Sequence, residues 1–227
     1  MELIVVGSSS DGNGYVLQND DEALIIECGR PFSEIKKAVG YNISKIVGAV
    51  VSHEHGDHAK YLHQYERLYP IFSPALGKGD KKATFGNFKI YSFPVVHDVD
   101  CYGFYIEHPD MGRLVFATDT QYVKYCFRNL RLNHIMIECN YQVGRFEVLS
   151  AKSEHVISGH MSEQAAMEFV EANMTEALRT VLFVHLSNEN ADWEEVTEDL
   201  EKMAQNRFKT YVAYSGLKVE LLRRWHA

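Results

Sequence analysis

The sequence of 227 residues contains few cysteines, no long apolar run and fewer basic than acidic residues. The cysteines lie far apart in apolar segments, without a C-x-x-C pair, and are Cys28, Cys101, Cys126 and Cys139. This spacing excludes a disulfide-rich scaffold and predicts reduced, mostly buried thiols in a cytoplasmic protein. No segment approaches the ~18 apolar residues of a transmembrane helix. The first residues lack the basic and apolar regions of a signal peptide, so we expect no contact with a membrane.

Acidic residues outnumber basic ones by 31 to 23, which gives a formal net charge of −8. This balance disfavours a protein that coats nucleic acid, because affinity for phosphate groups normally comes from an excess of lysine and arginine. Much of the negative charge lies on a predicted outer helix near residues 191–205, so a phosphate site elsewhere is not excluded. The 11 histidines are a rich supply of the commonest metal-ligating side chain.

Short apolar runs rich in Val, Ile, Phe and Tyr predict strands, and amphipathic segments between them predict helices. No linker, repeat or break in composition divides the chain, so we expect one domain over residues 1–227. Strands and helices that do not alternate strictly favour a layered α/β domain with a mixed sheet. The expected strands are Leu3–Val6, Tyr15–Leu17, Ala23–Cys28, Val47–Ser52, Phe88–Val96, Tyr102–Glu107, Leu114–Ala117, Ile135–Cys139, Val181–Leu186, Tyr211–Tyr214 and Lys218–Leu222. The expected helices are Ser33–Val39, Ala59–Tyr69, Ser162–Asn173 and residues 191–205, and Ser73–Gly86 is expected to be a loop.

The strongest local signal follows the apolar run Val47–Ser52 and reads His53-Glu54-His55-Gly56-Asp57-His58. Three imidazoles and one carboxylate so close together cannot all point the same way on a helix or a strand. In a tight loop that pivots on Gly56, they can surround two adjacent ions. This H-x-H-x-D-H pattern therefore predicts a metal site.

Two divalent ions need more ligands than this loop supplies. Three further candidates lie at or just beyond the ends of predicted strands, and they are His97, Asp119 and His185. Functional side chains are often placed on loops at the ends of a rigid scaffold, so we expect these three to complete the site. Nitrogen and oxygen ligands accommodate zinc, manganese or iron.

These residues resemble, in order, the ligand motifs of the metallo-β-lactamase (MBL) fold hydrolases, over about residues 3–190. The resemblance implies a four-layer αββα sandwich, of the α/β or α+β class, with two divalent ions at one edge. It implies that one ion is held by His53, His55 and His97, the other by Asp57, His58 and His185, and that Asp119 bridges both. In such a site a hydroxide between the ions is the nucleophile, and we expect Asp57 to orient it.

Smaller motifs resemble the YycJ/WalJ-type branch of this fold. They are the Ser/Gly-rich turn Gly7–Gly14, His97-Asp98, Thr118–Thr120, Glu138–Tyr141, Ser158–Ser162 and His185–Asn190. The resemblance implies a metal-dependent exonuclease that degrades double-stranded DNA in the 5′-to-3′ direction. DNA is thus the expected partner, and no feature of the sequence indicates an obligate protein partner.

Several residues are candidates for contact with that substrate. A Ser/Gly-rich turn exposes hydroxyl and N–H groups that can hold phosphate, and a helix N-terminus favours anions. The phosphate contacts expected on this basis are Ser9, Asn13, His160 and Ser162, and His160 is also the expected acid for the leaving oxygen. The segment Lys78–Lys82 is a candidate duplex contact. Phe127 and Tyr141 are candidates for stacking on a base.

The sequence departs from the usual pattern at several positions. Glu27 stands where the fold usually has aspartate, and Gly14 replaces the usual serine or threonine. The segment Gly144–His155 lacks the typical basic residues, which leaves the substrate open. The alternative is a hydrolase of a small ester, thioester or lactone on the same scaffold. A metal-binding module without activity is disfavoured, because all seven expected ligands are present.

Overall fold

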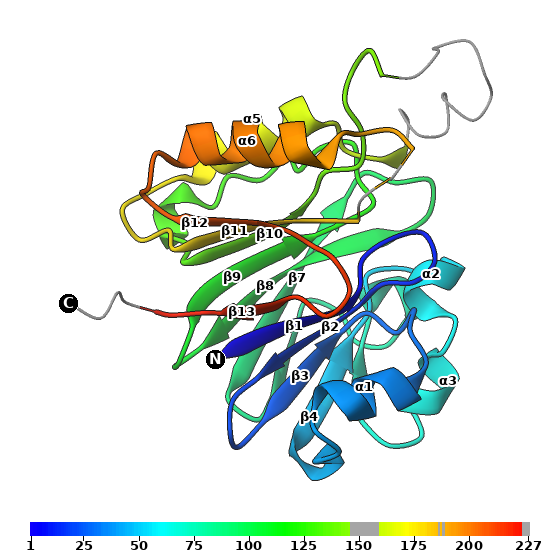
Figure 1. Ribbon diagram of the computed structural model, residues 1–227. Coiled ribbons are helices and arrows are strands. Elements are labelled where there is room, and N and C mark those ends of the chain that lie inside the picture. Colours follow the sequence, from blue (N-terminus) through cyan, green and yellow to red (C-terminus); the bar gives the residue numbers. More distant parts are fainter. Residues whose placement is uncertain (146–158, 186, 188, 224–227) are drawn as a thin grey trace.

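Two β-sheets are stacked face to face at the centre of the molecule, and helices cover their outer faces (Figure 1). The computed structural model describes residues 1–145, 159–185, 187 and 189–223. The first sheet has the strand order β13-β1-β2-β3-β4-β5. Its strands are β1 (Glu2–Gly7), β2 (Gly14–Gln18), β3 (Ala23–Ile26), β4 (Ile46–Val50), β5 (Ile71–Phe72) and β13 (Lys218–Glu220).

The second sheet has the order β12-β11-β10-β9-β8-β7-β6. Its strands are β6 (Lys82–Phe85), β7 (Phe88–Val95), β8 (Cys101–His108), β9 (Gly112–Ala117), β10 (His134–Glu138), β11 (Thr180–Val184) and β12 (Lys209–Val212). Strands β9 to β12 run parallel, and β7 shares their direction because β8 is antiparallel to both β7 and β9. The carboxyl ends of β7, β9, β10 and β11 therefore lie at one edge of this sheet.

The helices form the two outer layers. Figure 1 shows α1 (Phe32–Ala38) and α3 (Leu62–Tyr65) outside the first sheet, and α5 (Glu163–Asn173) and α6 (Trp193–Ala204) outside the second. A short helix α2 (Gly56–Ala59) follows β4, and 3₁₀ turns cover Ile43–Lys45, Pro74–Leu76 and Arg128–Leu130. The expected αββα sandwich is thus confirmed. None of the described helices has the length and apolar character that a membrane crossing requires.

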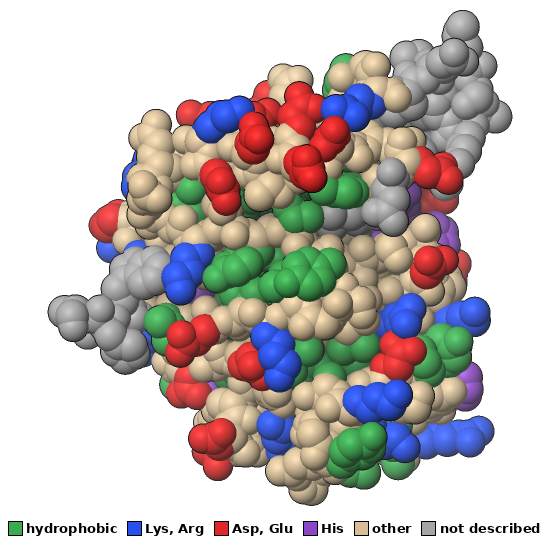
Figure 2. Space-filling model, viewed as in Figure 1, with side chains coloured by type: hydrophobic (Ala, Val, Ile, Leu, Met, Phe, Trp, Pro, Cys, Tyr) green, Lys and Arg blue, Asp and Glu red, His purple; other side chains and the backbone are tan. Residues whose placement is uncertain are grey.

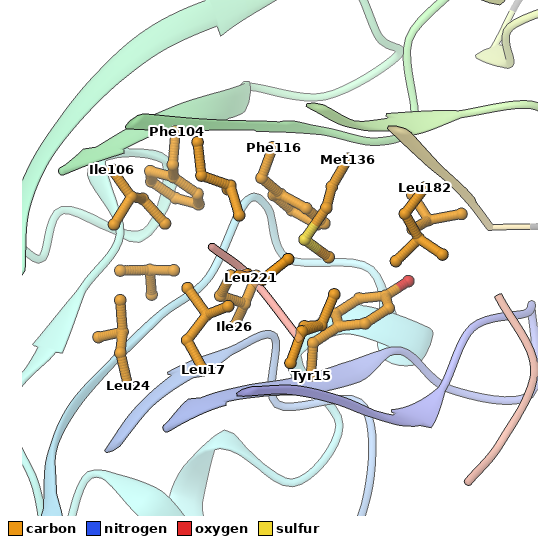
Figure 3. Packing of buried hydrophobic residues seen from close by; sticks show 14 of the residues in the cluster. Tyr15, Leu17, Leu24, Ile26, Phe104, Ile106, Phe116, Met136, Leu182 and Leu221 are labelled. Carbon is orange, nitrogen blue, oxygen red and sulfur yellow. The ribbon is translucent and has the colours of Figure 1, made fainter. Parts of the chain in front are cut away.

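The largest apolar core lies between the sheets, where alternate side chains of each strand point inward. Figure 3 shows side chains of the first sheet facing side chains of the second across this layer. The first sheet contributes Tyr15, Leu17, Leu24 and Ile26, and the second contributes Phe104, Ile106, Phe116, Met136 and Leu182. Two smaller cores attach α5 and α6 to the second sheet and α1 to the first.

Two differences from the expected elements have a clear physical cause. Ser73–Gly86 is not only a loop, because it contains the edge strand β6, whose side chains are exposed or half-buried and so give no apolar run. The expected helix Ala59–Tyr69 is interrupted, because Tyr61 N donates to Cys28 O outside the helix. Leu186, at the end of one expected strand, lies outside the described residues, as does most of Gly144–His155.

The thiols follow the expectation with one exception. All four cysteines are free, and three of them are buried, while Cys126 is exposed. Cys126 lies in the irregular segment between Asp119 and the 3₁₀ turn Arg128–Leu130, and its Sγ lies 3.7 Å from Ala172 O of α5.

His134, at the start of β10, makes folding stability depend on pH. Its side chain is buried, Nε2 donates to Met111 O at 3.0 Å, and Nδ1 has no hydrogen-bond partner among the described residues. Burial lowers the pKa of His134 from 6.5 to about 3. The unfolded chain takes up this proton near pH 6.5 and the folded chain does not, so stability is complete above that pH and falls below it.

The expected loss is about 1.4 kcal/mol per pH unit between pH 6.5 and 3. Urea unfolding at pH 7.5 and 5.5 measures it, with His134→Gln as the variant that lacks the titrating group. The wild type should lose about 1.4 kcal/mol more than the variant over this range. Equal losses in the two proteins would show that His134 does not titrate in this way.

Candidate metal centre

The loop after β4 carries four of the expected site residues. Strand β4 is buried, and the chain leaves it through His53 and His55 before one turn of helix α2 presents Asp57 and His58. The side chains of His53 and His58 are fully buried, whereas that of His55 is 34% exposed. The loop therefore turns two imidazoles inward and leaves one at an accessible edge.

Three more site residues follow strands of the second sheet. His97 lies two residues after β7, Asp119 two after β9, and His185 directly after β11. Asp119 and His185 have positive φ angles of 50° and 54°. Such a backbone costs on the order of 1–3 kcal/mol in a residue other than glycine, and strain of this kind concentrates at functional sites. Because these strands run in the same direction, the three side chains meet at the sheet edge that faces the β4 loop.

The structure brings all seven expected residues together in two groups that could each hold a metal ion. Within each group the candidate ligand atoms lie within 4.8 Å of one another. The first group is His53, His55, His97 and Asp119, and the second is Asp57, His58, Asp119 and His185. Asp119 belongs to both groups and is almost fully buried between them. This is the arrangement that two adjacent ions with one shared carboxylate require.

The positions of the candidate ligand atoms suit binding to divalent cations better than hydrogen bonding to one another. His53 Nε2 is buried without a hydrogen-bond partner among the described residues, 3.6 Å from Asp119 Oδ2. His55 Nδ1 and His97 Nε2 lie 3.2 Å apart. A buried polar atom without a partner is costly, and a cation bound to these nitrogens would remove that cost.

In the second group (Asp57, His58, Asp119 and His185), nearby carboxylates set the pKa values of the histidines. Burial alone would lower the pKa of His58 and His185, but the charge of Asp119 and the other carboxylates that contact them together outweigh it, raising the pKa of His185 to about 10 and that of His58 well above its usual value. Burial would raise the pKa of Asp57, yet hydrogen bonds from His185 and His58 hold it below its usual value. Ligation requires neutral imidazoles, so binding of a cation here would release protons.

His53 behaves differently from these two histidines. Burial, together with the positive charge of His58, lowers the pKa of His53 to about 2. Its Nδ1 lies 2.9 Å from Ser52 Oγ. His53 is therefore neutral at physiological pH, the state in which imidazole binds a metal.

Other side chains orient the candidate ligands. His97 Nδ1 donates to Gly159 O at 3.1 Å, and Thr118 Oγ1 donates to Asp119 Oδ1 at 2.7 Å. Glu27 has a positive φ of 67° at the end of β3, and its carboxylate accepts from Ser52 N and lies 3.5 Å from His58 Nδ1. Contacts of this kind fix the direction in which a ligand points.

Glu138 is a site residue that the ligand pattern did not predict. It ends β10 and is fully buried, and its Oε1 accepts from His160 Nδ1 at 2.7 Å and from His185 Nδ1 at 3.0 Å. Its other oxygen accepts from Thr120 N at 2.9 Å. Together with Asp119, the three residues form a third group with metal-ligand geometry. The sequence signals for Glu138 were its position at the end of a strand and its place in the Glu138–Tyr141 motif, and neither assigned it a role at the metal cluster.

The expected substrate contacts lie at different distances from this cluster. His160 is beside it, with its ring stacked on that of His185 at 5.2 Å. Asn13 is buried, and its Nδ2 donates to Asp57 Oδ2 at 3.1 Å, so it supports the loop. Ser162 Oγ caps α5 by accepting from Ala165 N.

The serine of the N-terminal turn that touches the site is Ser8, not Ser9. Ser8 Oγ accepts from His185 N at 2.8 Å, whereas Ser9 Oγ accepts from Asp11 N. Both aromatic residues that were candidates for stacking on a base are buried. Phe127 packs against Phe93 at 5.0 Å, so its ring is not open to a base.

Three comparisons relate the chain to known proteins. The family model described as "Metallo-beta-lactamase superfamily" matches residues 9–72. The exodeoxyribonuclease YycJ of Bacillus anthracis is 28% identical over 84% of this chain and 84% of its own length. The exodeoxyribonuclease WalJ of Streptococcus pneumoniae is 26% identical over 82% of this chain and 81% of its own. The crystal structure of the MBL-fold protein YhfI from Bacillus subtilis superposes with a TM-score of 0.71 at 20% identity, over 96% of this chain and 99% of that one.

Proposed function

The chain carries a metallo-β-lactamase superfamily domain and is a metal-dependent hydrolase of that fold, and from this premise we propose that it is a DNA exonuclease. The reaction is the hydrolysis of phosphodiester bonds of double-stranded DNA, from the 5′ end, with two divalent cations. The observation that carries the proposal is Asp119, shared by two ligand groups, in a chain whose relatives are named exodeoxyribonucleases. The polarity and the duplex preference rest on the resemblance of the motifs.

In this proposal the seven residues hold two cations, which we take to be zinc or manganese, with iron as a further option. Two such cations lower the pKa of a water toward ~7 and offset the charge that develops on a phosphate. Asp57 Oδ2, which lies between the ring nitrogens of His58 and His185, orients the attacking water.

His160 gives a proton to the leaving oxygen in this proposal. Its Nδ1 is held by Glu138, so the proton comes from Nε2. The stacking of His160 on His185 keeps the ring at the rim of the cluster, where 14% of the side chain is exposed. General acids of this kind contribute about 10²–10⁴-fold to a rate.

We expect DNA to reach the metal centre from a side of the molecule that α6 does not cover. Figure 2 shows acidic side chains gathered over that helix, and the helix sequence includes Glu194, Glu195, Glu198, Asp199 and Glu201. Lys81 and Lys82 lie exposed at the start of β6, next to the half of β7 that leads toward His97. Lys78 forms an ion pair with Glu66 at 2.8 Å, which makes it a weaker candidate for a duplex contact.

Removal of these two exposed charges should weaken duplex binding. For Lys81→Gln/Lys82→Gln, the slope of log K against log salt should fall in magnitude by about 2, because each phosphate contact contributes roughly 0.9. Fluorescence anisotropy with a labelled duplex at several salt concentrations measures this slope. Lys36→Gln/Lys37→Gln on α1 is the control of equal charge. An unchanged slope in the first variant would remove Lys81 and Lys82 from the interface.

The proposal as a whole is tested with duplex DNA labelled at the 5′ end in one sample and at the 3′ end in another. Incubation with Mn²⁺ or Zn²⁺ should release labelled mononucleotide at once from the 5′-labelled strand and only late from the 3′-labelled one. EDTA should stop the reaction. If DNA stays intact while a generic thioester or lactone is hydrolysed, the protein is a small-molecule hydrolase instead.

A further inference from the structure

A cavity of about 670 Å³ lies at the edge of the second sheet opposite the metal cluster. Its walls come from β6 to β9 and from the segments that enter β10 and β11. Strands β7, β9, β10 and β11 carry site residues at their other ends, five to eight residues away from the pocket lining, so roughly 17–26 Å of strand separates the cavity from the metal cluster. We call it the arginine pocket.

Positive charge dominates the arginine pocket, although the chain as a whole has a net charge of −8. Two carboxylates face five cationic side chains. The cations are Lys89, Arg113, Arg131, Arg179 and Arg223, and the carboxylates are Glu107 and Glu176. The lining thus keeps a net positive charge whichever ion pairs form. A concave surface with charge of one sign concentrates the field on an oppositely charged ligand.

One buried asparagine fixes the backbone of the segments that bear three of these arginines. Asn133 Oδ1 accepts from Arg113 N at 3.0 Å, and Asn133 O accepts from Arg179 N at 2.8 Å. Its Nδ2 donates to Arg223 O at 3.3 Å. Gly112 makes this packing possible, because a Cβ there would lie 2.1 Å from Asn133 Oδ1. The pocket is therefore built before any ligand arrives, which lowers the entropic cost of binding.

Ion pairs and hydrogen bonds hold two of the guanidinium groups in place. Arg131 Nη1 pairs with Glu176 Oε1 at 2.7 Å, and its backbone has a positive φ of 52°. Arg113 Nη1 donates to Leu130 O, and Nε lies 3.3 Å from Glu107 Oε1. The N–H groups that these contacts leave unused could donate to the oxygens of a phosphate, because a guanidinium carries five N–H donors in a fixed geometry.

We propose that the arginine pocket binds a small phosphate-bearing anion of about the size of a mononucleotide. The volume lies within the range of about 300–1,000 Å³ that small-molecule sites occupy. No Phe, Tyr or Trp is among its described lining residues, so recognition rests on the phosphate and not on stacking of a base. This site is separate from the metal cluster and does not depend on the proposed nuclease activity.

The test is a titration of the Zn²⁺-loaded, ¹⁵N-labelled full chain, followed by two-dimensional NMR. The probes are 5′-dAMP and inorganic phosphate, in separate experiments. Saturable shifts of the amide signals of Gly112, Arg113 and Asn133 are expected with at least one probe. Tighter binding of 5′-dAMP identifies a nucleotide as the ligand, whereas equal affinities identify phosphate itself. Shifts confined to the loop His53–His58, or none with either probe, would overturn the proposal.

Variants of equal charge change test whether binding depends on the arginine pocket or on the overall charge of the molecule. Lys89→Gln/Arg223→Gln removes two exposed cations of the lining and should weaken binding of the probe at least 10-fold. Lys36→Gln/Lys37→Gln removes the same charge from α1 and should leave the affinity unchanged. Lys89→Gln alone should give an intermediate loss, and thermal melting of each variant reports on folding. Equal affinities in the wild type and in Lys89→Gln/Arg223→Gln would contradict the assignment.

Discussion

Asp57→Ala is expected to lower kcat by roughly 10³-fold or more, which corresponds to about 4 kcal/mol of transition-state stabilisation. The carboxylate lies 3.0 Å from His58 Nε2 and 3.1 Å from His185 Nε2, so its loss removes both a candidate ligand and the group proposed to orient the water. Initial rates on end-labelled duplex DNA measure the effect.

The neighbouring carboxylate supplies a matched control for this variant. Glu54 lies in the same loop but is exposed and belongs to neither ligand group. Glu54→Ala should therefore retain nearly full activity, and circular dichroism should show both variants folded. If Asp57→Ala kept more than a tenth of the wild-type rate, Asp57 would have no essential role in the reaction.

Glu138→Gln is expected to lower both metal affinity and kcat, because this residue acts through two histidines. The glutamine has nearly the same shape, but it loses the charge that holds His160 Nδ1 and His185 Nδ1 at a single oxygen. Loss of such a supporting contact typically costs 10–100-fold in metal affinity or activity. Metal affinity and kcat should therefore both fall, and excess metal should restore part of the rate.

The variant His160→Gln distinguishes proton donation by His160 from metal ligation by it. If His160 only delivers a proton, this variant should lower kcat and leave KM and metal content near those of the wild type. If its metal content fell as well, His160 would be a ligand, as the third group in the structure allows. For the other variant, Glu138→Gln, unchanged kcat and metal affinity would show that Glu138 does not position His160 and His185.

The residues of the site differ in how far the sequence can predict them. The loop His53–His58 is local, so its composition alone indicates metal chemistry, and Asp119 and His185 were predicted because they lie at or near the ends of apolar strands. Glu138 ends a strand as well, but its role depends on β10 lying between β9 and β11, which is a pairing between distant segments. The role of Asn133 could not be predicted for the same reason, because its hydrogen-bond partners, which include Arg113, Arg179 and Arg223, lie in distant segments of the chain.

The elements that the sequence did not predict have physical causes. Edge strand β6 is paired on one side only and has no buried side chain, so no apolar run marks it. Phe127 and Tyr141 were candidates for stacking on a base, but an aromatic side chain next to a motif gives no indication of the side on which it packs. Phe127 instead fills the core between the second sheet and α5.

The central claim is that one buried carboxylate, that of Asp119, joins two ligand groups, each of which holds a divalent ion. The number of divalent ions bound per chain tests this claim most directly. Elemental analysis of the purified active protein, combined with native mass spectrometry, should give two ions per chain. Asp119→Ala should lose both ions and all activity, because Asp119 belongs to both groups. A wild-type protein that is fully active with one ion, or an Asp119→Ala variant that keeps two, would contradict the account.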